Sequence, residues 1–233
     1  MGKPSFEVCG RGLLEKNFFE GRYYMKTRRT ALALVLFSAF TFWGTSVFAN
    51  TAQAGDATAQ VFIEGLAQEA VQALTADGVS RTDRVNRFRE LLQRNFDVPL
   101  IGKWVLGRYW RTATDAEKEE YLRLFEEYVV ITYVERFDQY SGEQIKVVKS
   151  VPEPGNDAVV YSEIHRPSGG EPIRVDWRVR NDADIYKIID VYVEGISMSQ
   201  SQRKEFTSVI RTQGGKVGGL LDVLRTKVES LSH

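Results

Sequence analysis

Hydrophobic side chains recur every three or four residues after residue 60, which is the spacing of an amphipathic helix. One such stripe covers residues 60–74, and a second begins near Ser80 and reaches Phe96. The segment 97–107 begins with Asp97, which can cap a helix, and has a proline in its first turn. The pattern therefore predicts three short helices in succession.

The longest helix is expected after Thr114. Thr114 and Glu117 have the spacing of a capping box, and the apolar stripe that follows is unusually aromatic and continues to Tyr140. Two more helices are expected near the C-terminus. Ser199 and Gln202 have the spacing of a capping box for the first of them, and a leucine-rich stripe over residues 220–228 marks the second.

After residue 142 the hydrophobic period changes from 3.6 residues to two, which is typical of strands. The segment 173–180 is the clearest, because its apolar residues alternate strictly with Arg and Asp. Asp190 falls on the charged face of the last strand, where we expect an ion pair with Arg178. The turns are too short for crossovers, so consecutive strands must be antiparallel. The four predicted strands are residues 144–150, 158–166, 173–180 and 185–194.

These elements predict the α+β class. A sheet with one apolar and one charged face buries the first against helices and exposes the second to water. We therefore expect a single curved antiparallel sheet of about four strands packed against several helices. Large aromatic residues are numerous, so the interior has two interpretations. Either the rings fill the core at native density, or they leave a hydrophobic ligand cavity between sheet and helices.

The N-terminal segment has the features of a secretory signal. Lys26, Arg28 and Arg29 precede an apolar run, residues 31–43, that is too short to span a bilayer. The small residues that follow predict cleavage after Ala49. We therefore assign residues 1–24 to an upstream extension, 25–49 to a signal peptide, 50–58 to a linker and 59–233 to one domain. The alternative is a membrane anchor that the mature protein keeps.

Composition excludes several classes of function. The chain has 31 basic and 31 acidic residues, and its first 49 residues hold seven Lys or Arg and three Asp or Glu. The remaining 184 residues therefore carry a formal charge of −4, which is not the balance of a nucleic-acid-binding protein. The single cysteine, Cys9, lies in the leader, and an exported domain without cysteine is typical of the bacterial periplasm.

Candidate chemistry in the exported part is sparse. Only His165 and His233 remain as histidines and no cysteine remains, which excludes metal-centred and thiol chemistry, and we predict no catalytic residue, no metal site and no cofactor. No glycine-rich phosphate loop follows a strand. The glycines at positions 214, 215, 218 and 219 lie between the last two helices, where we expect a flexible joint.

Three long ungapped strings, residues 96–101 (FDVPLI), 105–111 (VLGRYWR) and 186–198 (YKIIDVYVEGISM), closely resemble the MlaC family of periplasmic lipid-transfer proteins, also called toluene-tolerance auxiliary proteins. The order of elements agrees from about residue 58 to the C-terminus. The resemblance implies an NTF2-like cone and a non-catalytic carrier that shuttles phospholipid between the outer and inner membranes. It also implies two partners, an outer-membrane lipoprotein complex and an inner-membrane ABC lipid transporter.

One departure from the family affects the predicted cargo. Many relatives have Asn-Tyr directly before the arginine that corresponds to Arg203, where this chain has Ser201-Gln202. This variant is more similar to the HpnM branch, which is encoded with hopanoid synthesis. Phospholipid is the predicted cargo, and a hopanoid or other isoprenoid lipid is the alternative. Two alternatives come from other classes of function. One is a small enzyme that acts on a hydrophobic substrate, and the other is a structural protein with a filled core.

Candidate site residues are those on the inward stripe of each expected element, and the same positions would suit a plain core. The lipid-binding candidates are Leu106, Trp110, Phe125, Tyr128, Val129, Tyr133, Val175, Trp177, Val191, Val193, Ile196, Met198, Phe206 and Ile210. Four cations flank the family strings and either meet a head group or a partner protein or are simply solvated. These are Arg108, Arg111, Arg203 and Lys204.

Overall fold

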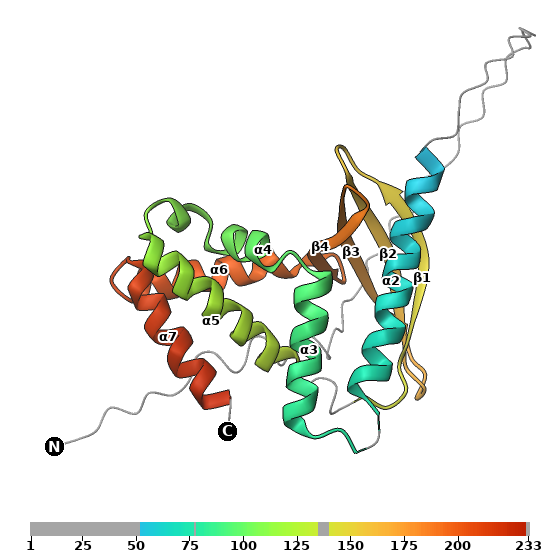
Figure 1. Cartoon of the computed structure of the whole chain (residues 1–233), viewed down its shortest axis with the longest axis horizontal. Helices are drawn as coiled ribbons and strands as arrows, with labels where there is room; N and C mark the ends of the chain where they lie inside the picture. The colour runs from blue at the N-terminus through green and yellow to red at the C-terminus, as the bar shows by residue number, and fades with distance from the viewer. Residues whose placement is uncertain (1–51, 77, 135–139, 232–233) are drawn as a thin grey trace, which may run out of the picture. The chain divides into compact units, whose positions relative to one another are not determined.

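A computed structural model describes residues 52–76, 78–134 and 140–231 (Figure 1). The predicted upstream extension and signal peptide lie outside these residues. The helices are α2 (Ala52–Leu74), α3 (Arg81–Asn95), α4 (Val98–Leu106), the 3-10 helix η1 (Gly107–Arg111), α5 (Asp115–Val134), α6 (Met198–Thr212) and α7 (Val217–Leu231). The strands are β1 (Gln144–Pro152), β2 (Asp157–His165), β3 (Ile173–Asp182), β4 (Ile185–Val193) and β5 (Ile196–Ser197).

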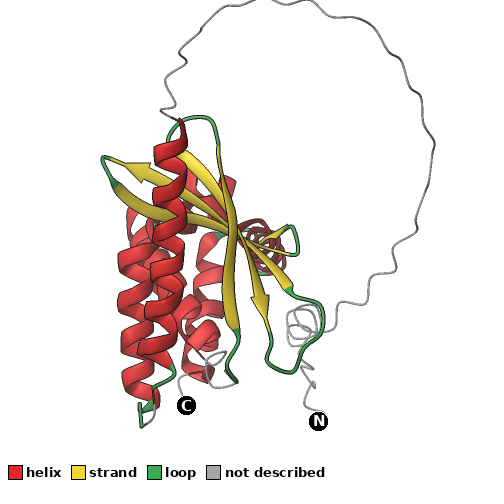
Figure 2. Cartoon of the chain, turned by 90° about the vertical axis from the view of Figure 1, so that its right-hand side faces the viewer, coloured by secondary structure: helices red, strands yellow, loops and turns green. Residues whose placement is uncertain are grey.

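The strands form one antiparallel sheet in the described part of the chain, in the order β1-β2-β3-β4-β5. This confirms the predicted α+β class and the antiparallel order. The sheet has five strands instead of about four, because β5 contains only two residues and is too short to show an alternating pattern. Figure 2 shows the twist of the sheet, with α2 lying across it.

A register shift keeps the apolar side chains of β4 on one face. Trp177 pairs with Val191 and Val179 pairs with Ile188, so Ile189 is an extra residue between two pairs. Such a bulge absorbs one residue and restores the alternation on either side of it. The two adjacent isoleucines in the sequence therefore do not interrupt the apolar face.

The apolar face of the sheet is covered by α2. Ala59 and Ile63 of this helix pack with Val160, Val179 and Ile188 of β2, β3 and β4, and all five side chains are buried. Burial of large aliphatic side chains contributes about 1.5–3 kcal/mol each, so this contact supplies much of the stability of the sheet.

A second hydrophobic core lies among helices α3 to α7. The rings of Tyr121, Phe125 and Tyr128 from α5 surround Phe206 from α6, with ring centroids about 6 Å apart. The Tyr121 hydroxyl donates to the carbonyl oxygen of Gly102 at 3.0 Å, so its buried polar atom is satisfied. Figure 1 shows these helices beside the layer formed by the sheet and α2, with α3 between the two.

The predicted helix starts are largely confirmed. Ser80, Asp97 and Thr114 each accept, through a side-chain oxygen, a hydrogen bond from a backbone N–H of the following turn. The predicted cap at Ser199 is wrong, because Ser197 caps α6. The helix begins two residues early because it follows directly from β5.

Helix α2 begins at Ala52, eight residues before the expected start at Gln60 and inside the segment predicted as a linker. Alanine has the highest helix propensity, and residues 52–59 contain four alanines but no large apolar residue. The sequence there favours a helix without giving it an amphipathic stripe, so a search for periodicity misses it.

The glycines between α6 and α7 do not form a simple flexible joint. Gly214 and Gly215 have positive φ angles of 83° and 78°, and the Gly215 N–H donates to the carbonyl oxygen of Ile210 at 2.8 Å. This is a left-handed helix C-cap, which glycine adopts without steric cost. Gly218 and Gly219 lie in the first turn of α7, and a Cβ on Gly219 would come within 2.5 Å of the backbone oxygen of Gln213.

We expect opposite effects from alanine at the last two of these positions. Gly219→Ala should destabilise the fold by about 1–3 kcal/mol, because the new methyl group overlaps Gln213. Gly218→Ala is the matched control, since its nearest neighbour, a Glu117 oxygen, lies 3.9 Å away, and it should stabilise α7 by up to about 1 kcal/mol. Urea unfolding followed by circular dichroism measures both values. Equal effects of the two variants would contradict the tight turn.

Candidate functional site

The predicted lipid-binding residues do not form one group in the structure. Half of them belong to the helical core and pack against one another there. Periodicity identifies the side of a helix that faces inward but not the element that it faces, which is why the sequence did not separate these positions. The residues in the helical core are Leu106, Trp110, Phe125, Tyr128, Val129, Phe206 and Ile210.

The strand residues form a second group on the apolar face of the sheet. Trp177 and Val191 pack against the cluster that α2 completes. Val175 and Val193 face each other across β3 and β4 and are buried, although neither belongs to the two packed clusters among the described residues. Met198 is half-buried at the start of α6. This end of the sheet is thus apolar and lies beyond the α2 contact.

Two predicted positions face solvent. Ile196 is 58% exposed, and Tyr133 is 39% exposed. The prediction that they point inward was wrong for both. Ile196 lies directly after the tight turn from β4 to β5, where Glu194 and Gly195 have positive φ angles, so the side chain leaves the face of the sheet.

A short polar chain fixes the tryptophan on the apolar face. The Trp177 indole N–H donates to the Ser162 hydroxyl at 2.9 Å, and this hydroxyl donates to the carbonyl oxygen of Val175 at 2.7 Å. Ser162 is almost fully buried. Because the Trp177 indole N–H and the Ser162 hydroxyl both have hydrogen-bond partners, these polar groups lie in apolar surroundings without the usual desolvation penalty.

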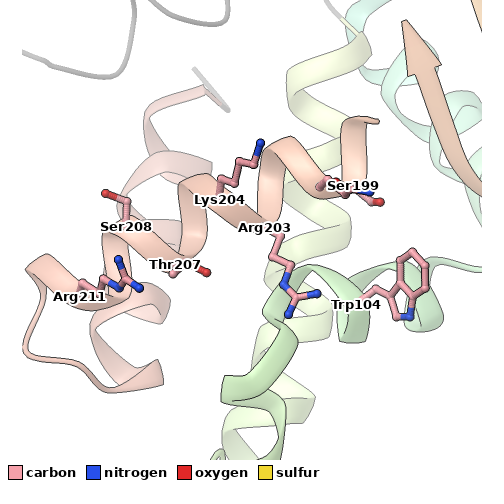
Figure 3. A pocket seen from close by; sticks show the side chains of 8 residues that line it. Trp104, Ser199, Arg203, Lys204, Thr207, Ser208 and Arg211 are labelled. Carbon is pink, nitrogen blue, oxygen red and sulfur yellow. The ribbon is translucent and has the colours of Figure 1, made fainter. Parts of the chain in front are cut away.

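The predicted cations lie on the helical part of the fold, around two open hollows. The first hollow, of about 660 Å³, is lined by Trp104 of α4 and by one flank of α6. Figure 3 shows Arg203 pointing from α6 toward the α4–η1 segment, with Lys204 leaving the same helix in a different direction and Arg211 further along it. Trp104 is 49% exposed at the edge of this hollow.

The second hollow, of about 730 Å³, lies between η1 and the start of α7. Arg108, Arg111 and Lys216 line it together with Tyr109. Arg108 donates to the Tyr109 hydroxyl at 2.9 Å. The guanidinium groups of Arg108 and, from the first hollow, Arg211 lower the pKa of Tyr109. Tyr109 therefore lies close to cations of both hollows. Neither of these two hollows is the predicted cavity between sheet and helices, which stays a prediction.

A glycine lets α6 approach η1 closely. Gly107 has a φ of 59°, and a Cβ there would lie 2.7 Å from the Arg203 Nε. The guanidinium of Arg203 thus rests directly against the backbone of Gly107. Only glycine permits both the backbone angle and this contact.

The cations around the hollows have no acidic partner among the described residues, whereas several other arginines of the protein are paired. Arg89, Arg180 and Arg225 each form ion pairs elsewhere in the fold. By contrast, no carboxylate of the described residues lies within 4 Å of the charged groups around the hollows. Glu117, which lines the second hollow, is bound in the Thr114 capping box. We name these six exposed cations the basic strip: Arg108, Arg111, Arg203, Lys204, Arg211 and Lys216.

Sequence reasoning found four members of the basic strip and missed Arg211, Lys216 and the exposed Trp104 beside them. Arg203 and Arg211 are eight residues apart on one helix, a spacing that places them on the same face and was available as a signal. Trp104 cannot be distinguished from a core residue by its pattern, because α4 is apolar at most positions. Lys216 lies in the turn between α6 and α7, where no periodic pattern marks it as part of a site.

The charged face of the sheet is neutralised internally. Asp157 is buried and accepts two hydrogen bonds from Arg180, at 2.7 and 3.1 Å, with Arg178 at 3.2 Å. Arg174 pairs with Asp176 at 3.0 Å, and burial raises the pKa of Asp176. Paired charges of this kind reduce the net field of this face of the sheet.

Asp190 connects the sheet to α6. The expected ion pair with Arg178 is wrong, although the two residues are opposite in register, because Arg178 turns to Glu153 and Asp157. The buried Asp190 carboxylate instead accepts hydrogen bonds from the Ser197 hydroxyl at 2.6 Å and from the Ser199 N–H at 3.1 Å. It therefore anchors the first turn of the helix that carries half of the basic strip.

Comparison with known proteins gives the family. The model of the family described as "MlaC protein" matches residues 64–226, well over half of the sequence. The chain belongs to the MlaC family. The match covers both the apolar face of the sheet and the whole basic strip.

Two individual relatives agree with this membership of the MlaC family. The chain is 23% identical over 176 residues to the intermembrane phospholipid transport system binding protein MlaC of Haemophilus influenzae, covering 70% of this chain and 79% of the relative. A phospholipid-binding protein of Ralstonia solanacearum, solved in complex with a phospholipid, has the same fold with a TM-score of 0.65 and 21% identity. That alignment covers 75% of this chain and 99% of the solved chain.

We expect Asp190→Ala to destabilise this MlaC-family fold by about 2–4 kcal/mol, because it leaves the buried Ser197 and Ser199 donors without an acceptor. Asp190→Asn keeps one acceptor oxygen and should cost less than half as much. The measurement is the free energy of unfolding in urea. If the two variants were equally stable, the carboxylate would not be the link between sheet and α6.

Proposed function

We propose that this protein is a phospholipid-binding transport protein that acts as a soluble, non-catalytic carrier in the periplasm. The observation that carries the proposal is membership of the MlaC family. The name of the Haemophilus influenzae relative and the phospholipid in the Ralstonia solanacearum structure support it. The signal-like segment before Ala49 supports export, and none of the described helices is long and apolar enough to cross a membrane.

We place the acyl tails against the apolar face of β3 and β4. Val175 and Val193 are buried there on adjacent strands, and Trp177 and Val191 continue the same face. The α2 contact lies toward the other end of these strands, at Val179 and its neighbours. Tails at the Val175 end would extend the covering that α2 begins.

The free energy of the tails explains why a carrier must enclose them. Transfer of one methylene from water to an apolar site gains roughly 0.8 kcal/mol, so two chains of about 15 methylenes represent on the order of 24 kcal/mol. Free phospholipid would essentially never be found in an aqueous compartment. Loss of chain freedom and imperfect packing offset part of the gain, which allows release.

The same proposal includes two membrane partners. A carrier of this family would receive lipid from an outer-membrane lipoprotein complex and exchange it with an inner-membrane ABC lipid transporter. A soluble shuttle between them would need no cofactor, since its cargo is not changed chemically. No group of His, Cys, Asp and Glu side chains in the described residues is arranged to hold a metal ion.

A hopanoid or other isoprenoid lipid is the second candidate cargo. The observation that favours it is Ser201-Gln202, which stands where many relatives have Asn-Tyr. Both residues are half-buried on α6, and the Ser201 hydroxyl donates to the carbonyl oxygen of Ser197 at 2.9 Å. They therefore change the side chains near the start of α6, the helix that follows directly from β5.

An enzyme acting on a hydrophobic substrate would need an acid among the apolar residues of the sheet. Asp176 is buried and its pKa is raised by burial, which are properties of a candidate acid. Its place between Val175 and Trp177 on β3, however, puts it on the opposite, charged face. This placement favours a carrier over an enzyme.

The proposal is tested by the lipid that purifies with the protein. Solvent extraction of the native protein followed by mass spectrometry should yield phospholipid, and a hopanoid would select the second cargo. Val175→Glu should lower the lipid content about fivefold or more, because a carboxylate would be buried against the tails. Val148→Glu is the matched control, since Val148 is 50% exposed on β1, and it should retain the lipid.

Both variants must be shown to fold by circular dichroism and thermal unfolding before their lipid is compared. An extract of native protein without any lipid would contradict the carrier function. Full lipid content in a folded Val175→Glu protein would place the tails elsewhere while leaving the carrier function standing.

A further inference from the structure

We propose that the basic strip is a docking surface for a membrane that contains anionic phospholipids. The strip combines six exposed cations from η1, α6 and the α6–α7 turn with two aromatic residues, Trp104 and Tyr109. This goes beyond the carrier function, since it concerns the surface on which the protein lands and not the lipid that it holds.

The charge of the strip is available to an external partner. No carboxylate of the described residues lies within ion-pair distance of its six cations, whereas the arginines of β3 are matched by Asp157, Asp176 and Glu153. The sequence after residue 49 carries a formal charge of −4. A protein with net negative charge approaches an anionic surface only in an orientation that presents a local positive patch.

The aromatic residues favour a lipid surface over an acidic protein. Trp104 is 49% exposed at the edge of the first hollow, and Tyr109 lines the second hollow with Arg108 over its ring, 4.9 Å from the centroid. Tryptophan and tyrosine beside basic side chains are the combination that anchors proteins at the head-group level of a bilayer. An acidic protein would require the cations but not the exposed indole.

The shape of the strip fits a surface and not a single small anion. Its cations line two open hollows of about 660 and 730 Å³, and Tyr109 of the second lies close to Arg211 of the first. Arg203 is held in place against Gly107, while the other five cations are exposed and can adjust to head groups. An extended row of this kind meets several phosphates at once, so its attraction is additive and weakens with salt.

The experiment is co-sedimentation of the full exported protein with vesicles. Vesicles of phosphatidylcholine with about 30% phosphatidylglycerol, which imitate a moderately anionic membrane, are compared with vesicles of pure phosphatidylcholine. Each kind is tested at low and at high salt. We expect binding to the anionic vesicles alone and its loss at high salt. Arg211→Gln/Lys216→Gln should weaken binding by about tenfold or more. Trp104→Ala should weaken binding while leaving its salt dependence unchanged.

The charge-matched control is Arg123→Gln/Lys146→Gln, which removes two exposed cations from α5 and β1, outside the strip. It should bind vesicles as the native protein does. Equal binding to both kinds of vesicle, or equal loss in the two double variants, would overturn the proposal. So would complete absence of vesicle binding, which would assign the strip to an acidic protein, or competition by millimolar glycerol phosphate, which would make it a small-anion site.

Docking and cargo binding are separated by one further variant. Val175→Glu alters the apolar face of the sheet and leaves the basic strip untouched, so it should bind anionic vesicles like the native protein. If native protein bound vesicles but contained no lipid, the carrier function would fail and the docking surface would remain. If it contained lipid but ignored vesicles, the docking surface alone would fail.

Discussion

The buried carboxylate of Asp190 joins the two parts of the interior at the start of α6. One part is the sheet with α2 and the other is the helical core. Among the described residues, their hydrophobic clusters share only the half-buried Phe96. Asp190 lies on β4 and accepts hydrogen bonds from the residues that begin α6, so it fixes the helix against the edge of the sheet. A carboxylate with several donors is directional in a way that hydrophobic contact is not.

This link sets the distance between the apolar face and the basic strip. The carboxylate stands on the strand that carries Val191 and Val193, and the helix that it anchors carries Arg203, Lys204 and Arg211. The contact of Arg203 with Gly107 then ties the same helix to η1, which contributes Arg108 and Arg111. The two surfaces are thus parts of one rigid path through β4, β5 and α6, although they differ in chemistry.

Much of the fold could be predicted from the sequence because its signals are local. The caps at Ser80, Asp97 and Thr114 and the alternation along β3 depend on neighbouring residues only. The start of α2 and the two-residue β5 were missed, since the first lacks an amphipathic pattern and the second is too short to have one. The partner of Asp190 was missed because pairing across the sheet competes with a helix N-terminus that comes later in the chain.

The candidate site could be predicted less well for the same reason. Inward-facing residues were recognised, but the sequence does not indicate which of them meet. Phe125 and Phe206 contact each other in the helical core, whereas Val175 lies on the apolar face of the sheet beside Val193. Cations next to the family strings were found, but no linear pattern shows that the fold gathers six cations around two hollows. No carboxylate of the described residues lies within 4 Å of these cations.

Separation of the two surfaces follows from what a lipid carrier must do. Burial of tails is strong, insensitive to salt and proportional to apolar area, whereas attraction between exposed cations and head groups is weak per charge and screened beyond about 8 Å at physiological salt. If one surface did both, stronger docking would also mean tighter retention and slower release. In the arrangement that we propose, with tails on the sheet and a membrane on the cations of α6 and η1, arrival at the membrane and transfer of the cargo would depend on different side chains. Each could then be weak or strong independently of the other.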